Sequence, residues 1–111
     1  MMWLVKWEDN WADEMDLQGF ALMTNEEMVR WARLVDAVAK KIDSGATFDW
    51  YVGTNEWVDY DNGDDFKRAS ICEMISDKDA EVLKRTILGD SKFYGLFPSE
   101  EALTYFLEDE G

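Results

Sequence analysis

Residues 23–45 form the stretch of the chain whose structure the sequence specifies most completely. Thr24, followed three residues later by Glu27, is a capping box, in which two side chains satisfy two backbone donors at a helix start. Apolar residues then recur at alternating spacings of three and four, the pattern of a helix with one buried face. They are Met28, Trp31, Val35, Val38 and Ile42. With Gly45 as a stop signal, the pattern predicts one long helix over about residues 25–43.

Apolar and β-branched runs elsewhere predict strands. These runs cover residues 2–7, 19–23, 47–52, 57–60, 66–75 and 92–97. Two shorter helices are predicted over about residues 77–88 and 99–108, with Ser76 and Ser99 as caps. The first of these should turn Ala80, Leu83 and Ile87 inward.

Connections are predicted from polar residues and glycine. Residues 8–16 are acidic and lack periodicity, so we expect a loop there, and residues 53–56 read as a turn. Asn62-Gly63 favours a type I′ hairpin turn that joins strand 57–60 to strand 66–75. Apolar residues on both faces of 66–75 predict a central position in the sheet.

Helices and strands do not alternate one for one, which predicts the α+β class. We expect a mostly antiparallel sheet of about five or six strands, covered by one long and two shorter helices. A length of 111 residues, 47% hydrophobic content and a single proline fit one domain with a real core, residues 1–111.

The charge balance limits the partners of this chain. Its formal net charge is −14, from 25 acidic and 11 basic residues, with no histidine. Direct binding to nucleic acid or to an anionic membrane needs basic patches, so the natural partner is a basic protein. Cys72 is the only cysteine, which excludes an intramolecular disulfide. We expect a cytoplasmic protein, because the N-terminal apolar run is too short for a signal peptide.

The acidic residues concentrate in three base-free stretches, residues 7–29, 42–66 and 93–111. Duplex DNA carries one phosphate charge per ~105 Å² of its surface. If the net charge of this chain were spread evenly over the surface of a monomer, its density would be several-fold lower. If the acids of residues 8–16 and 56–65 converge with those of the C-terminus, fifteen carboxylates would share one face and would reach the density of DNA. Acidic loops that are merely solvated are the alternative.

The six tryptophans fall into two groups. Trp31 lies on the helix stripe, and Trp3 and Trp7 share one face of the first strand, so we expect these three in the core. Trp11 and Trp57 lie among carboxylates and turn residues. They either anchor a protein interface, as tryptophan often does, or lie under their own loops.

Signals for catalysis or cofactor binding are missing from the sequence. Without histidine there is no imidazole base, and no phosphate-binding or dinucleotide motif is present. Cys72 is expected to be a buried, inert thiol. Residues 59–65 are rich in aspartate, as a calcium-binding loop is. With Gly63 at the sixth position of such a loop, however, Val58 and Tyr60 would stand where oxygen ligands are needed. No metal site is therefore expected. We therefore expect no enzyme and no cofactor.

Two functions remain open. The first is a non-enzymatic inhibitor, of the kind carried by phages or mobile elements, that presents a DNA-like surface to a nuclease, restriction enzyme or CRISPR effector. Its predicted binding residues are Asp9, Trp11, Asp13, Glu14, Asp16, Glu56, Trp57, Asp59, Asp61, Asp64 and Asp65. The second is an intracellular adaptor or immunity-type interaction domain, monomeric or homodimeric, whose acidity serves solubility. Its interface would use exposed aromatics such as Phe97, Tyr105 and Phe106.

Overall fold

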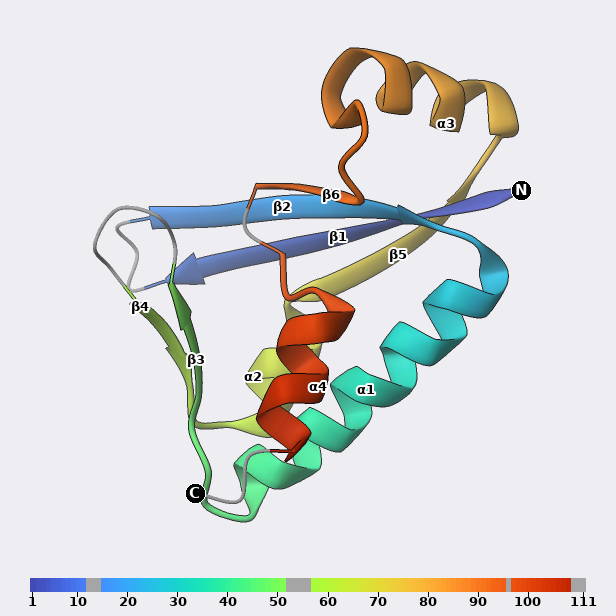
Figure 1. The fold of residues 1–111 in the computed structure, drawn as a ribbon. Coiled ribbons are helices and arrows are strands. Elements are labelled where there is room, and N and C mark those ends of the chain that lie inside the picture. Colours follow the sequence, from blue (N-terminus) through green and yellow to red (C-terminus); the bar gives the residue numbers. More distant parts are fainter. Residues whose placement is uncertain (12–14, 52–56, 96, 109–111) are drawn as a thin grey trace. The chain divides into compact units, whose positions relative to one another are not determined.

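A computed structural model describes the backbone of residues 1–11, 15–51, 57–95 and 97–108, with side chains except at 9–11, 15–18, 49–51, 57 and 58. The predicted α+β class is confirmed, and the strand pairs are antiparallel (Figure 1). The strands are β1 (Met2–Trp11), β2 (Met15–Met23), β3 (Phe48–Tyr51), β4 (Trp57–Tyr60), β5 (Ser70–Ile75) and β6 (Phe93–Gly95). The helices are α1 (Asn25–Asp43), α2 (Gly63–Arg68), α3 (Asp77–Leu83), the π-helical turn η1 (Lys84–Leu88) and α4 (Glu100–Glu108).

The chain divides into two units, with the boundary inside α1. Unit 1 comprises Met1–Arg30 and Ala69–Phe97, and unit 2 comprises Trp31–Arg68 and Pro98–Gly111. The strands accordingly form two sheets, a four-stranded sheet of order β5-β1-β2-β6 in unit 1 and the β3-β4 pair in unit 2. Among the described residues, no helix has both the length and the apolarity to cross a membrane.

Strands β1 and β2 form a long hairpin in unit 1. Asn10 pairs with Asp16 and Trp11 with Met15, so the loop predicted over residues 8–16 is wrong on both sides of residues 12–14. Asp and Asn are poor strand formers when considered alone. The pairing of the apolar residues of β1 with those of β2 continues without a break into the acidic residues. Strand pairing therefore overrides the low strand propensity of Asp and Asn.

Helix α3 covers one face of the unit 1 sheet. Leu22, Ala80 and Leu88 are buried together, with a rim of partly buried apolar side chains around them. The rim consists of Met2, Leu4, Phe20, Ile75 and Leu83. Ser76 caps α3 as predicted, since its side chain accepts a hydrogen bond from the N–H of Asp79.

The end of this helical segment differs from the prediction. Ile87 is 46% exposed and Leu88 only 6% exposed. The cause is the π-helical turn η1, in which the N–H of Gly89 donates to the carbonyl of Lys84, five residues earlier. A π turn holds more residues than an α turn, so the inward position moves one residue along the chain.

The predicted strand over residues 66–75 is wrong in its first half and in its position. Phe66 lies in α2, and β5 begins only at Ser70. Among the residues that the structure describes, β5 pairs with β1 alone and forms an edge of the sheet, not its centre. The apolar residues on its two faces are therefore partly exposed, as Ile71 (39%) and Met74 (53%) show.

Unit 2 is built on the buried face of α1. Trp31, Val35, Val38, Ala39 and Ile42 are buried, which confirms the predicted stripe. The indole N–H of Trp31 donates to the carbonyl of Pro98, 2.9 Å away, just before α4. Helix α4 begins as predicted, with the Ser99 hydroxyl accepting from the N–H of Ala102, and contributes the fully buried Leu103.

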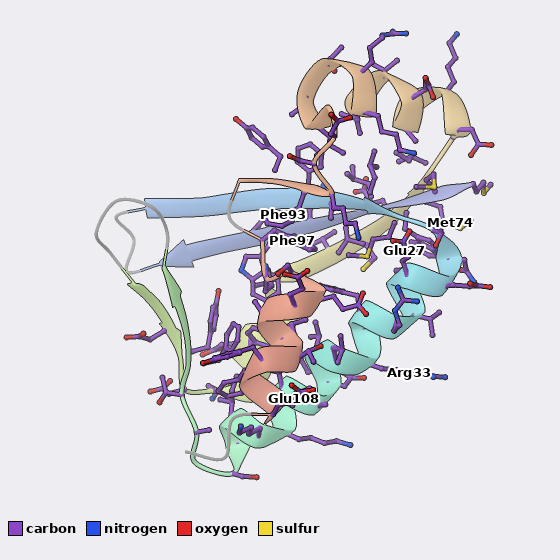
Figure 2. All side chains as sticks on the ribbon, viewed as in Figure 1. Glu27, Arg33, Met74, Phe93, Phe97 and Glu108 are labelled. Atoms are coloured by element: carbon purple, nitrogen blue, oxygen red, sulfur yellow. The ribbon has the colours of Figure 1, made fainter. Side chains whose placement is uncertain are left out.

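The capping box at the start of α1 is present (Figure 2). The N–H of Thr24 donates to the Glu27 carboxylate, and the N–H of Glu27 donates to the Thr24 hydroxyl. The hydrogen bond from the Thr24 backbone lowers the pKa of the Glu27 carboxyl. We expect Thr24→Ala to reduce the free energy of unfolding by about 1 kcal/mol, measured by urea denaturation at neutral pH.

The Glu27 carboxylate also makes this contribution depend on pH. Because its pKa is depressed in the folded chain, its stabilisation is present above the unfolded pKa and is lost as pH falls through the folded one. Glu27→Gln retains the capping geometry without the charge. We expect Glu27→Gln to be less stable than the parent at pH 7, and the difference to shrink below about pH 4. A difference that is independent of pH would contradict this account.

Candidate functional site

In residues 59–66 of unit 2, a buried residue recurs every third position, and the residues around it are exposed. Tyr60 is 4% exposed and Phe66 is fully buried, with Gly63 also buried between them. Each of the intervening residues is exposed, and four of them are aspartates. We call these four the acidic corner: Asp59, Asp61, Asp64 and Asp65.

Asn62 turns the chain from β4 into α2. Its side-chain oxygen accepts hydrogen bonds from the N–H groups of Asp64 (2.9 Å) and Asp65 (3.2 Å), and its carbonyl accepts from the N–H of Phe66. Asn62 is therefore a helix N-cap, and the predicted type I′ hairpin turn is wrong. Asn62 with acids two and three residues later is as good a helix start as Asn62-Gly63 is a turn, and burial of Phe66 decides in favour of the helix.

Gly63 fixes the position of α2 against the end of α1. Its N–H donates to a carboxylate oxygen of Asp43, 2.9 Å away. A Cβ at this position would lie 2.5 Å from the carbonyl oxygen of Ala39, closer than real contacts allow. Any larger residue would push α2 away, so glycine is required here for close approach.

An aromatic cluster anchors the corner from beneath. Phe66 makes edge-to-face contacts with Phe48 and Tyr60, with ring centroids 5.2 and 5.3 Å apart. Phe48 also meets Phe106 of α4 at 4.9 Å, and the Lys41 ammonium lies 4.5 Å from the centre of that ring. Edge-to-face aromatic pairs add stability beyond area burial, so the two strands and two helices of this cluster stabilise the packing beneath the acidic corner.

Only some of the four aspartates of the acidic corner have a basic side chain as an ion-pair partner. Asp65 pairs with Arg68 at 2.8 Å, one turn along α2. Among the described residues, no ion pair involves Asp59, Asp61 or Asp64. Asp64 and Asp65 also occupy the first turn of α2, where the helix dipole favours negative charge. The corner thus presents three carboxylates that no recorded basic side chain neutralises.

The sequence interpretation missed Asp49. It is the Cα partner of Asp59 across the β3-β4 ladder. The pairing register, which sequence alone did not provide, was the only signal that could have identified it.

Unit 2 carries more of the net charge in fewer residues. Its thirteen acidic and five basic residues give −8 over 52 residues, whereas unit 1 has twelve and six, giving −6 over 59. Exposed Glu100, Glu101 and Glu108 of α4 belong to the same unit as the acidic corner.

The predicted binding residues divide between the two units. Asp9 and Trp11 lie in β1, Asp16 in β2 and Trp57 in β4. Asp13, Glu14 and Glu56 lie outside the described residues. Only Asp59, Asp61, Asp64 and Asp65 are both described with side chains and gathered in one place. The convergence of residues 8–16 with residues 56–65 stays a prediction.

Unit 1 has an open groove of about 310 Å³ on the sheet face that α3 covers in part. Phe20 and Tyr94 form one wall, with ring centroids 5.8 Å apart. Lys6 on its floor is paired with Glu73 at 3.4 Å. The remaining lining is Leu4, Glu8, Gly19 and Leu83. With its one ammonium group already paired, the groove offers no convergent set of polar groups to fix a ligand.

The aromatics of the predicted adaptor interface are mostly internal. Phe97 is 5% exposed and stacks with Phe93 (Figure 2), and Phe106 is half-buried under Lys41. Tyr105 alone of the three is exposed, at 77%. The prediction that Phe97 and Phe106 form an exposed interface is therefore wrong.

Cys72 also differs from the prediction. It is exposed, because β5 is an edge strand. Partial burial of its sulfur nevertheless raises the pKa of the thiol above its ordinary value, so little thiolate is present at neutral pH. Among the described residues, no group of three or more potential ligands is placed to hold a metal ion.

Comparison of the chain with protein-family models, curated proteins and solved structures gives no match. The function must therefore be argued from the charge and geometry of the residues themselves.

Proposed function

We propose that this chain is a non-enzymatic inhibitor that occupies the cationic groove of a nucleic-acid-handling protein with its acidic corner. Candidate targets are a nuclease, a restriction enzyme or a CRISPR effector. The observation that supports this function best is the pattern of buried and exposed positions in residues 59–66. Every exposed side chain there is an aspartate or the N-cap Asn62, and the segment contains no basic residue.

Concentration of charge, not total charge, supports mimicry. Dividing the accessible surface of 7300 Å² by the net charge of −14 gives about 520 Å² per net charge, against roughly 105 Å² per phosphate on duplex DNA. Asp59 lies in β4 and Asp61 follows its last residue, so their Cα atoms are at most about 6.8 Å apart, the span of two extended residues; this is twice the ~3.4 Å rise per phosphate of one DNA strand. The acidic corner therefore stands in for three or four phosphates, not for a turn of duplex.

A contact made by three or four carboxylates determines what the partner must provide and how binding should depend on salt. The partner needs arginine or lysine residues placed for phosphates, which bind carboxylates with similar geometry. The negative field of the chain accelerates encounter with a basic groove, and salt screens that attraction. The packed aromatic cluster beneath the corner limits the conformational entropy that the corner loses on binding.

A purified panel of nucleases, restriction enzymes and CRISPR effectors tests this function. The chain, labelled with a fluorophore at its N-terminus, is titrated with each protein and followed by anisotropy. We expect micromolar or tighter binding to at least one member at about 50 mM salt, weakened at least tenfold at about 200 mM salt. Binding that does not respond to salt, or no binding to any member, would reject the proposal.

A further inference from the structure

Strand β5 is the longer of the two edge strands in unit 1, and its outer side has no strand partner among the described residues. The opposite edge, β6, is protected by being only three residues long and by ending at Gly95 with φ +72°. Edge strands are usually guarded by lysine, proline or a bulge. Strand β5 (SICEMI) contains neither residue type, and it pairs with β1 through six consecutive residues without a bulge.

The hydrogen-bonding direction of each β5 residue follows from one contact. The N–H of Glu8 donates to the carbonyl of Ala69, its partner position in the β1-β5 register. Bonded and non-bonded pairs alternate along an antiparallel ladder. Ile71 and Glu73 therefore direct their backbone groups toward β1, and Cys72 and Met74 direct theirs to the outer edge.

The outer edge of β5 is also apolar and nearly uncharged in a strongly acidic chain. Ile71 is 39% exposed and Cys72 is exposed. Met74, labelled in Figure 2, is 53% exposed. The single charge, Glu73, is offset by Lys6 at 3.4 Å. Two copies of a −14 chain repel each other least where their surfaces carry least charge, and this edge provides such a surface.

We propose that β5 pairs antiparallel with β5 of a second copy of this chain, with the two Cys72 residues opposite each other on the two-fold axis. The two four-stranded sheets then form one sheet of eight strands. This inference does not depend on the acidic corner or on the identity of its target.

The register follows from hydrogen bonding and charge. With Cys72 opposite the partner's Cys72, the N–H and C=O groups of β5 that point away from β1 lie opposite the equivalent groups of the second copy. They can therefore form hydrogen bonds along the whole strand. Ile71 then faces the partner's Glu73. Shifting the axis to Glu73 would oppose two carboxylates, which destabilises a strand pair. Shifting it to Ile71 would bring α2 residues into the ladder and shorten it.

Cross-linking through the native cysteine tests the register. Opposite Cα atoms in a bonded pair lie about 5.5 Å apart, within the range that a disulfide spans. Mild oxidation at alkaline pH, chosen because burial raises the pKa of the thiol, should yield a covalent dimer of twice 12.9 kDa on a non-reducing gel. Under reducing conditions, sedimentation at micromolar concentration should show the same mass. A monomer in both experiments would overturn the proposal.

Three lysine variants separate this dimer from other associations. Cys72→Lys places like charges opposite each other and should weaken dimerisation at least tenfold, whereas Ile71→Lys faces the partner's Glu73 and should weaken it less than threefold, although the new lysine also lies opposite Lys6 of β1. Val82→Lys, 40% exposed on α3, makes the same charge change away from β5 and should have little effect. Circular dichroism checks the fold of each variant. Equal effects of Cys72→Lys and Ile71→Lys would overturn the register.

Salt distinguishes the dimer from the proposed inhibitory complex. Self-association of two acidic chains should strengthen as salt screens their repulsion, whereas binding to a basic target should weaken. A dimer that dissociates with rising salt would contradict apolar edge pairing and leave the inhibitor proposal unaffected.

Discussion

Replacing Phe66 by alanine is expected to lower the free energy of unfolding by about 3–5 kcal/mol, the usual cost of removing a fully buried phenylalanine. Phe66 is 0% exposed. Its ring makes edge-to-face contacts with both strands of the β3-β4 pair, through Phe48 and Tyr60. A two-stranded sheet is marginal without such packing, so the loss should loosen the acidic corner as well as create a cavity.

Urea denaturation followed by tryptophan fluorescence measures this loss. Tyr105→Ala provides the control, because it removes an aromatic ring of the same unit that is 77% exposed, and it should cost no more than about 0.5 kcal/mol. Similar losses in the two variants would mean that Phe66 does not anchor the corner.

Removing the three carboxylates without recorded ion pairs is expected to weaken binding to the basic target about 100-fold. The change is Asp59→Asn, Asp61→Asn and Asp64→Asn in one chain. Each substitution retains side-chain size and removes one charge-assisted contact, and such contacts cost 1–2 kcal/mol or more when lost. Stability should change little because all three side chains are exposed.

A matched variant separates the corner from the overall charge. Asp79→Asn, Glu81→Gln and Asp90→Asn remove the same three charges from exposed positions of unit 1, and both triple variants have a net charge of −11 instead of −14. Affinities measured by anisotropy titration should fall less than fivefold for this control. Equal weakening of the two would show that only total charge matters, and the acidic corner would no longer be a site.

Local signals were sufficient where several of them agreed. In α1 the capping box, the apolar stripe and the final glycine point to the same residues, and the helix runs from Asn25 to Asp43 as predicted. The same holds for the cap at Ser76 and for the α+β class. Each of these depends on neighbours within one or two turns.

Predictions failed where long-range pairing decided between two local choices. Asn62-Gly63 suits a hairpin turn and a helix start alike, and the burial of Phe66 selects the helix. Residues 8–10 are poor strand formers, yet they extend β1 into the hairpin. Strand β5 appeared central because both faces are apolar, yet it forms an edge. No pattern within a six-residue window contains that information.

The candidate site was predictable only in part. The base-free run of residues 42–66 indicated where acids concentrate, and four of its members do form one exposed corner. Their alternation with Tyr60, Gly63 and Phe66 depends on the helix that begins at Asn62, which was not predicted. The pairing of Asp49 with Asp59 depends on strand register, which sequence alone leaves open.

Competition with DNA tests the central claim most directly. A target from the panel is loaded with a fluorescent duplex, and this chain is titrated in at constant salt. We expect the duplex to be released completely, with its apparent dissociation constant rising linearly with the concentration of the chain, and the Asp59, Asp61 and Asp64 triple variant to need about 100-fold more protein. A ternary complex in which the duplex stays bound would contradict the account.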